Sequence, residues 1–174
     1  MKVRARQFNI YLTVMAASAL LAGCETTKPH GPVSALRVHL EANADTTGTS
    51  QSVSVLRADP VIVTIAQQPI LTEANIIATK VIDAPGGFAV EIRFDETGTW
   101  ILEQYSAANP GRHLIIFGQW GEKLANGRWL AAPLITHRIA NGALAFTPDL
   151  SRPEADRLVL GLNNVARFYK KHPK

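Results

Sequence analysis

Five histidines are the side chains best suited to bind a metal or transfer a proton in this 174-residue sequence. No two of them stand four residues apart, as a helical metal site requires, and no His-Glu-x-x-His motif occurs. Two of them, His39 and His137, are expected on the solvent faces of strands. We therefore predict surface histidines and no metal site, although spacing alone leaves open a site assembled in three dimensions. The five are His30, His39, His113, His137 and His172.

Nucleophilic catalysis needs a serine, threonine or cysteine beside a base, and no serine here lies in a Gly-x-Ser-x-Gly elbow. The adjacent acids Asp95 and Glu96 are typical of a helix start. Gly86-Gly87 lacks the context of a phosphate-binding loop. The sequence therefore predicts neither an enzyme nor a cofactor. A hydrolase would require His, Asp and Ser side chains to converge in one cleft.

The formal charge of +4 is concentrated at the start of the chain. Lys2, Arg4 and Arg6 carry three of these charges, and no acid lies among the first 23 residues. The rest of the chain is almost neutral, so the charge does not indicate a nucleic-acid partner.

Residues 1–23 have the composition of a secretory signal, in which a basic start precedes the apolar stretch Ile10–Leu21. That stretch has about 12 residues, whereas roughly 20 are needed to span the hydrocarbon core of a bilayer. It leads into Leu20-Leu21-Ala22-Gly23-Cys24, which resembles the lipobox of bacterial lipoproteins. The resemblance implies cleavage before Cys24 and acylation of that residue, with two or more acyl chains giving a stable anchor. A plain signal peptide with an incidental cysteine is the alternative.

The predicted organisation is a signal peptide over residues 1–23, a lipidated tether over 24–33 and one domain over 34–174. The length favours a single domain. We expect the chain to be anchored in the cell envelope and to face the periplasm. Glu25 after the acylated cysteine weakly favours the outer membrane over the inner one.

Alternating apolar residues and turn signals predict strands in the mature chain, and capping patterns predict helices between them. A short helix is expected after Thr72, a second from Asp95 to about Asn109 with Ile101, Leu102, Tyr105 and Ala108 buried, and a last one from a capping box at Ser151 and Glu154. Two Asn-Gly pairs, at 126–127 and 141–142, predict hairpin turns. Strands are expected at 35–41, 53–56, 61–65, 88–94, 114–117, 134–139 and 143–146. We predict an α+β fold in two layers, an antiparallel or mixed sheet with two main helices packed on one face.

Aromatic residues near a glycine-rich loop are the strongest indication of a binding surface. Trp120 and Trp129 flank the loop Gly121–Gly127, in which Glu122 and Lys123 are charged. Exposed aromatics of this kind are enriched in protein-binding hot spots. We predict a partner-binding site at Trp120, Trp129, Glu122 and Lys123. The alternative is that each tryptophan covers the edge of a small core.

The order of features from Phe88 onward resembles the head subdomain of the first periplasmic domain of SecD, an accessory subunit of the bacterial protein-export channel. The matching residues are Asp95, Gly98, Leu102, Ser106–Asn109, Gly111, Leu114–Ile116, Ala131–Ile135, Ile139, Gly142, Phe146-Thr147, Glu154-Ala155 and Leu158, with Pro69–Thr72, Ala74 and Ile76 upstream. The insertion around Gly121–Arg128 departs from the family pattern. The chain also has no apolar run for the transmembrane bundle of SecD.

The resemblance implies a SecD-head-like fold and, more weakly, a role in handling polypeptides. We therefore expect a non-enzymatic envelope lipoprotein whose head binds an unfolded polypeptide or an envelope protein, as an accessory to protein export. The alternative is a structural lipoprotein that docks one fixed partner and has no transport role.

Overall fold

Two antiparallel sheets and a separate hairpin make up the strands of the computed structural model, which describes residues 29, 31–45 and 48–172. The four-stranded sheet has the order β4-β1-β7-β8, the three-stranded sheet has the order β5-β6-β9, and β2 pairs only with β3. The strands are β1 (Ala35–Leu40), β2 (Ser50–Val55), β3 (Val61–Ala66), β4 (Leu71–Thr72), β5 (Ile76–Ala84), β6 (Gly87–Phe94), β7 (Leu114–Trp120), β8 (Asn126–Ala131) and β9 (Ala143–Phe146).

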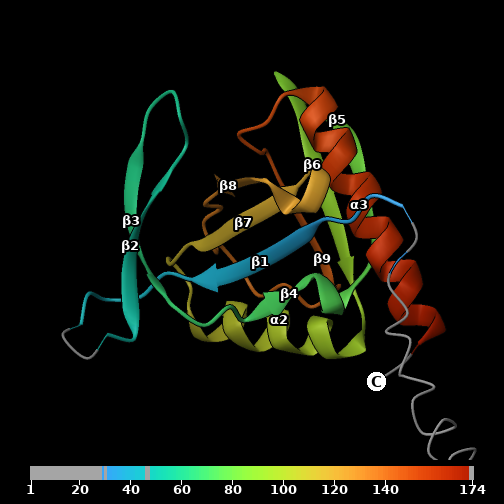
Figure 1. The fold of residues 1–174 in the computed structure, drawn as a ribbon. Coiled ribbons are helices and arrows are strands. Elements are labelled where there is room, and N and C mark those ends of the chain that lie inside the picture. The colour runs from blue at the N-terminus through green and yellow to red at the C-terminus, as the bar shows by residue number, and fades with distance from the viewer. Residues whose placement is uncertain (1–28, 30, 46–47, 173–174) are drawn as a thin grey trace, which may run out of the picture.

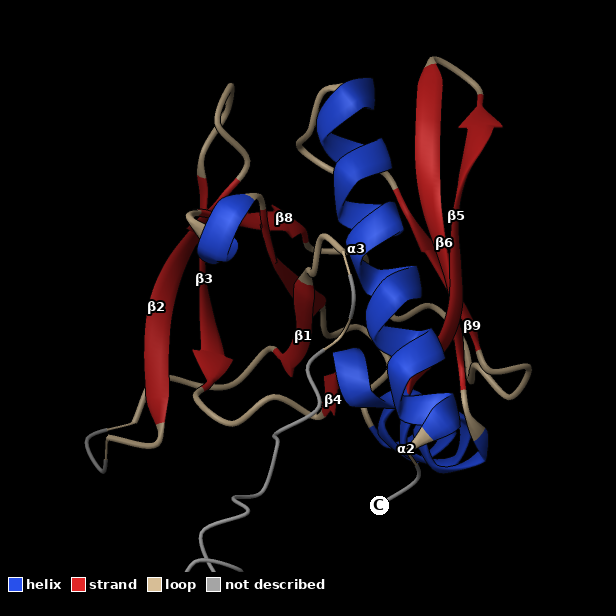
Figure 2. Cartoon of the chain, turned by 45° about the vertical axis from the view of Figure 1, so that its right-hand side comes forward, coloured by secondary structure: helices blue, strands red, loops and turns tan. Residues whose placement is uncertain are grey.

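Two main helices pack against these sheets (Figure 1). α2 (Glu96–Ala108) contacts β4 and β6, and α3 (Arg152–Lys171) runs beside β5 and also contacts β1 and β7 (Figure 2). Two single 3-10 turns complete the described part, η1 (Glu73–Asn75) and η2 (Glu122–Leu124). The predicted α+β class with antiparallel strands and two main helices is confirmed. No helix among the described residues is both long and apolar enough to span a bilayer.

The four-stranded sheet is covered on both faces. Successive residues of a strand point to opposite faces, and its central strands β1 and β7 bury side chains on each of the two. In β7, Leu114, Ile116 and Trp120 join the main core with α3 and the three-stranded sheet. Ile115 points to the other face, where it joins a small cluster with Val55, Val63 and Ile65 of the β2–β3 hairpin. The hairpin therefore covers the outer face of this sheet.

α3 lies close to β1 and to the free edge of β5. Gly161 of α3 is buried, and a Cβ added there would lie 2.7 Å from the backbone nitrogen of Ser34. This close approach explains a glycine in the interior of a helix, where it costs about 1 kcal/mol relative to alanine. Asn163 of α3 accepts a hydrogen bond from the Thr79 amide at 2.8 Å and donates one to the Thr79 carbonyl at 2.9 Å. Its side chain takes the place of a neighbouring strand at this edge.

The predicted starts of α2 and α3 are confirmed. Asp95 caps α2 by accepting a hydrogen bond from the Gly98 amide at 2.6 Å, and the Ser151 amide donates to the Glu154 carboxylate at 2.8 Å. The buried face of α2 differs from the prediction, since Leu102 is buried together with Gly98 and Ser106 whereas Tyr105 is exposed. Small residues at these positions let the helix approach the core closely.

Several predicted elements differ from the observed ones. Thr72 caps a helical turn as predicted, but the helix is only the single turn η1, because Ile76 and Ile77 are β-branched and begin the edge strand β5. The pair Asn126-Gly127 lies within β8, and the chain turns earlier, through η2. The segment 134–139 is not a strand, because Leu134 forms only a single bridge with His113. The hairpin predicted at Asn141-Gly142 is therefore wrong as well, since β9 pairs with β6.

Candidate functional site: a groove beside Trp100

Trp120 does not lie on the surface. Its side chain is 2% exposed in the main core, and the guanidinium of Arg128 lies 5.4 Å from the centre of its ring. The prediction of a surface aromatic at this position is therefore wrong. The physical reason is that β7 continues to residue 120, so the alternation that buries Leu114 and Ile116 also buries Trp120.

Trp129 is half-buried on the opposite face of the same sheet. Its ring packs 4.8 Å from that of Phe117 and 5.4 Å from that of His39, beneath the β2–β3 hairpin. The two tryptophans that the sequence placed at one loop thus point to different faces of the sheet. Trp129 packs against the small cluster under the hairpin.

Glu122 and Lys123 are exposed on η2, where Lys123 has a φ of 52°. A contact between these two charged side chains and a partner stays a prediction. Cys24, the predicted site of acylation, lies outside the described residues.

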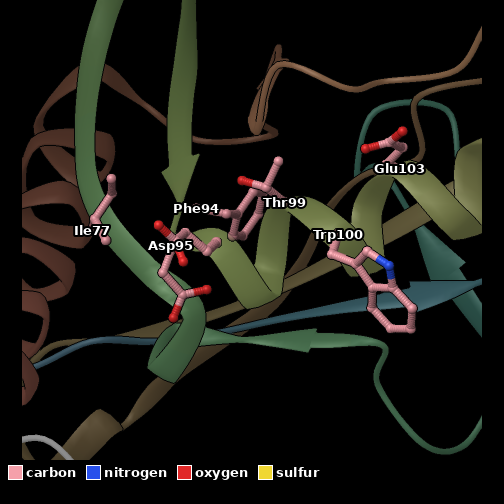
Figure 3. A pocket seen from close by; sticks show the side chains of 7 residues that line it. Ile77, Phe94, Asp95, Thr99, Trp100 and Glu103 are labelled. Carbon is pink, nitrogen blue, oxygen red and sulfur yellow. The ribbon is translucent and has the colours of Figure 1, made fainter.

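Trp100 is the exposed tryptophan of this domain, with 60% of its surface accessible. It stands on the first half of α2, whose start is fixed by the Asp95 cap and whose inner face is fixed by Gly98 and Leu102. The indole therefore sits on a rigid helix and projects away from the core (Figure 3).

A β-bulge places a second large apolar side chain beside this helix. Ile76 pairs with Phe94 and Ala78 pairs with Arg93, so Ile77 is the extra residue of β5. Bulges of this kind redirect a side chain away from the regular alternation. Ile77 is 60% exposed as a result.

Trp100 and Ile77 line an open groove of about 580 Å³, shown in Figure 3. Acidic side chains border it. Asp95 is engaged as the helix cap, Glu103 pairs with Arg138, and Glu96 is exposed at the first turn of α2. The lining residues are Ile77, Phe94, Asp95, Glu96, Thr99, Trp100 and Glu103. The groove thus combines apolar walls with an acidic border.

A second hollow of about 940 Å³ continues from this groove, and the two share Ile77 and Asp95. Its far side is formed by the end of α3, where Arg167 and Lys170 carry positive charge. The combined depression therefore runs from an acidic end beside α2, over the apolar side chain of Ile77, to a basic end on α3. Such a surface suits a polypeptide segment with an apolar side chain between charged ones.

The predicted binding site does not include Trp100, which lies in the helix predicted from Asp95 to about Asn109. The signal was present in the spacing of Gly98, Leu102 and Ser106, which recur every four residues and mark the buried side of α2. Trp100 falls two residues from that stripe, on the outer side of the helix. The exposure of Ile77 had no such signal, because a bulge depends on pairing with a distant strand.

His39 is buried, at 5% exposure, and the prediction of a solvent-facing histidine is wrong at this position. It shares the outer face of β1 with Arg37, but the hairpin covers that part of the face. Its Nδ1 lies 2.9 Å from the Ala66 carbonyl of β3, to which it donates when protonated there. Burial lowers the pKa of His39 below 6.5, against the opposing effect of the Ala66 hydrogen bond, and Arg37 lowers it further.

This depressed pKa of His39 predicts a loss of stability in mild acid. The unfolded chain binds a proton at this imidazole more readily than the folded chain. The contribution of neutral His39 to the unfolding free energy is therefore fully present above about pH 6.5 and is lost as the pH drops below it. His39→Asn, which retains a donor, should flatten the dependence of the unfolding free energy on pH between about 6.5 and 5. Guanidinium denaturation at several pH values measures this dependence for both proteins. Equal slopes for the two proteins in that range would contradict the prediction, and the range from about pH 7 to 8 serves as the internal control.

His113 makes a second imidazole contact, in which both its side chain and that of Glu41 are half-buried. Its Nδ1 lies 2.7 Å from Oε2 of Glu41, and its amide donates to the same oxygen at 2.8 Å. The pKa of Glu41 is lowered: desolvation opposes the shift, and the hydrogen bonds from His113 outweigh it.

Among the residues that the structure describes, no group of three or more His, Cys, Asp or Glu side chains is placed to hold a metal ion.

Comparison with known proteins gives matches at the level of structure. No protein-family model matches the sequence, and no curated protein matches it either. The fold matches a solved structure of SecDF, described as a membrane component that enhances protein export, with a TM-score of 0.52 and 19% identity over 77% of this chain. SecDF in its super-membrane-facing form matches with a TM-score of 0.53, also at 19% identity over 77% of this chain. The fold is SecD-like.

The SecD-like domain corresponds to only part of those proteins. It spans 64% of the first SecDF chain and 19% of the second. The resemblance read from the residues of this sequence is thereby confirmed at the level of fold. The Trp100 groove is a feature of this chain's own residues, which the likeness in fold does not assign.

Proposed function

We propose that this protein is an envelope lipoprotein, anchored through acylated Cys24, whose SecD-like head binds polypeptides as an accessory to protein export. The head is non-enzymatic in this proposal and faces the periplasm. Its partner is a polypeptide that presents apolar side chains, and its contact surface is the Trp100 groove. This location replaces the loop beside Trp120, because the ring of Trp120 is buried.

The observation that carries the proposal is the pair of exposed apolar side chains on rigid elements. Trp100 and Ile77 are each 60% exposed and line the same groove. Tryptophan is the residue most enriched in binding hot spots, and clustered apolar exposure beside a polar border is typical of interaction sites. A helix start and a bulge hold the two side chains in place, which lowers the entropy lost on binding.

The likeness to SecDF supports the choice of partner. The matched SecDF structure is described as a component that enhances protein export. A polypeptide in transit through the envelope exposes the apolar residues that its folded form later buries. The acidic border at Glu96 favours segments in which such residues stand next to lysine or arginine.

Photocrosslinking in cells tests this proposal. A benzophenone amino acid replaces Trp100 in the full-length lipoprotein, and a matched variant carries it at Arg157, which is exposed on α3 outside the groove. We expect many secreted or outer-membrane polypeptides to crosslink from position 100 and few from position 157. One dominant folded partner from position 100 would favour the fixed-docking alternative. No crosslink from position 100 beyond that from 157 would contradict binding at the groove.

A further inference from the structure

The β2–β3 hairpin has one edge that is used within the domain and one that is free. The amide of Gln67 donates to the Thr49 carbonyl at 3.0 Å, and this pair continues the register of the hairpin. Hydrogen-bonded and non-hydrogen-bonded pairs alternate in an antiparallel ladder. Ser50, Ser52 and Ser54 therefore direct their backbone N–H and C=O groups outward from β2.

The corresponding edge of β3 is occupied. The Thr64 carbonyl accepts a hydrogen bond from the Ala42 amide at 2.9 Å, and the Ala66 carbonyl lies 2.9 Å from Nδ1 of His39. Glu41 also forms a bridge with Ile65. These contacts join β3 to the end of β1, so this side of the hairpin cannot accept another strand.

The edge of β2 has no such cover. No residue in the described part of the chain hydrogen-bonds the outward backbone groups of Ser52 and Ser54, and both residues are exposed. The strand has the sequence Ser-Gln-Ser-Val-Ser-Val, without the charges or proline that protect natural edges. The edge of β5 differs, since Asn163 occupies the backbone of Thr79 there.

Apolar surface lies next to this free edge. Ile62 is paired with Ser54 across the hairpin and is 76% exposed on its outer face. A strand added to β2 would place alternate side chains on that face, close to Ile62 on the diagonal. The main chain of the added strand supplies the hydrogen bonds, and small or β-branched side chains fit the flat surface.

We propose that β2 binds an extended polypeptide segment as a third strand of the hairpin. The inference takes its class of partner from the proposed function and uses a surface separate from the Trp100 groove. A second copy of this chain is disfavoured, because the inner face of the hairpin packs on β7 and β8. In an antiparallel pair of two β2 strands, both domain bodies would lie on the same side of the joined sheet and meet beneath it. A single extended strand needs only about 5 Å of space beside β2.

Hydrogen exchange on the full-length protein tests this inference. The probe is a peptide of alternating threonine and valine with a lysine at each end. Its matched control carries methyl groups on the central amides, which removes hydrogen-bond donors from both of its edges. We expect the unmethylated peptide to slow exchange of the Ser52 and Ser54 amides about tenfold or more, and the methylated peptide to leave both unchanged.

Two variants complete the test. Ser52→Pro removes an outward amide without removing a bond to β3, and should weaken peptide binding about tenfold, whereas Ser52→Ala should bind normally. Trp100→Ala should leave the protection of Ser52 and Ser54 intact, which separates this edge from the groove. Peptide binding without protection of β2, or equal protection by the methylated peptide, would overturn the inference. A dimer in sedimentation that Ser52→Pro converts to a monomer would also overturn it, by assigning the edge to a second copy.

Discussion

Trp120→Ala is expected to lower the free energy of unfolding by about 3–5 kcal/mol, the range typical for truncation of a large buried aromatic side chain. The ring is 2% exposed and belongs to the main core together with Leu130 of the neighbouring strand. Its removal leaves a cavity that the rigid sheet cannot close, and it also removes the surface over which Arg128 lies. Equilibrium unfolding in guanidinium, followed by circular dichroism, measures the change.

Trp100→Ala is the matched control for this prediction. The same chemical change at a side chain that is 60% exposed should alter the unfolding free energy by no more than about 0.5 kcal/mol. Similar losses for the two variants would show that Trp100 is part of the packed domain. A small loss for Trp120→Ala would mean that its ring is available at the surface after all.

Local patterns were sufficient for the elements whose signals lie close together in the chain. Asp95 with Gly98, and Ser151 with Glu154, mark the starts of α2 and α3, because a cap is completed within one turn. The alternation over β1 and β6 likewise places Val38, Val90 and Ile92 in the core. These elements, together with the ordered resemblance to SecD, were enough for the fold class.

Features that depend on distant partners were missed. The first turn after Thr72 has helical signals, yet pairing with Phe94 in β6 converts the next residues into β5 and its bulge. His39 alternates with apolar residues as an exposed side chain would, and only the hairpin at residues 50–66 buries it. Alternation of apolar and polar residues predicts a sheet with one face buried and the other in solvent, whereas the four-stranded sheet is buried on both faces.

The same reason explains the misplaced candidate site. Trp120 and Trp129 are close in sequence across a turn, but strand pairing sends them to opposite faces of one sheet. Trp100 and Ile77 are 23 positions apart, and the pairing of β5 with β6 brings Ile77 to the start of α2. A binding surface formed by long-range pairing is visible only in the folded chain.

Affinity for an unfolded polypeptide tests the central claim most directly, namely that the groove beside Trp100 binds apolar segments. The full-length protein in detergent is titrated with a reduced, carboxymethylated protein that cannot fold, and binding is read by calorimetry. Trp100→Ala should raise the dissociation constant about tenfold or more, because a hot-spot aromatic contributes about 2 kcal/mol or more. Leu160→Ala, which truncates another half-exposed apolar side chain on α3 outside the groove, should leave it unchanged. An unchanged dissociation constant for Trp100→Ala, or equal weakening by both substitutions, would contradict the account.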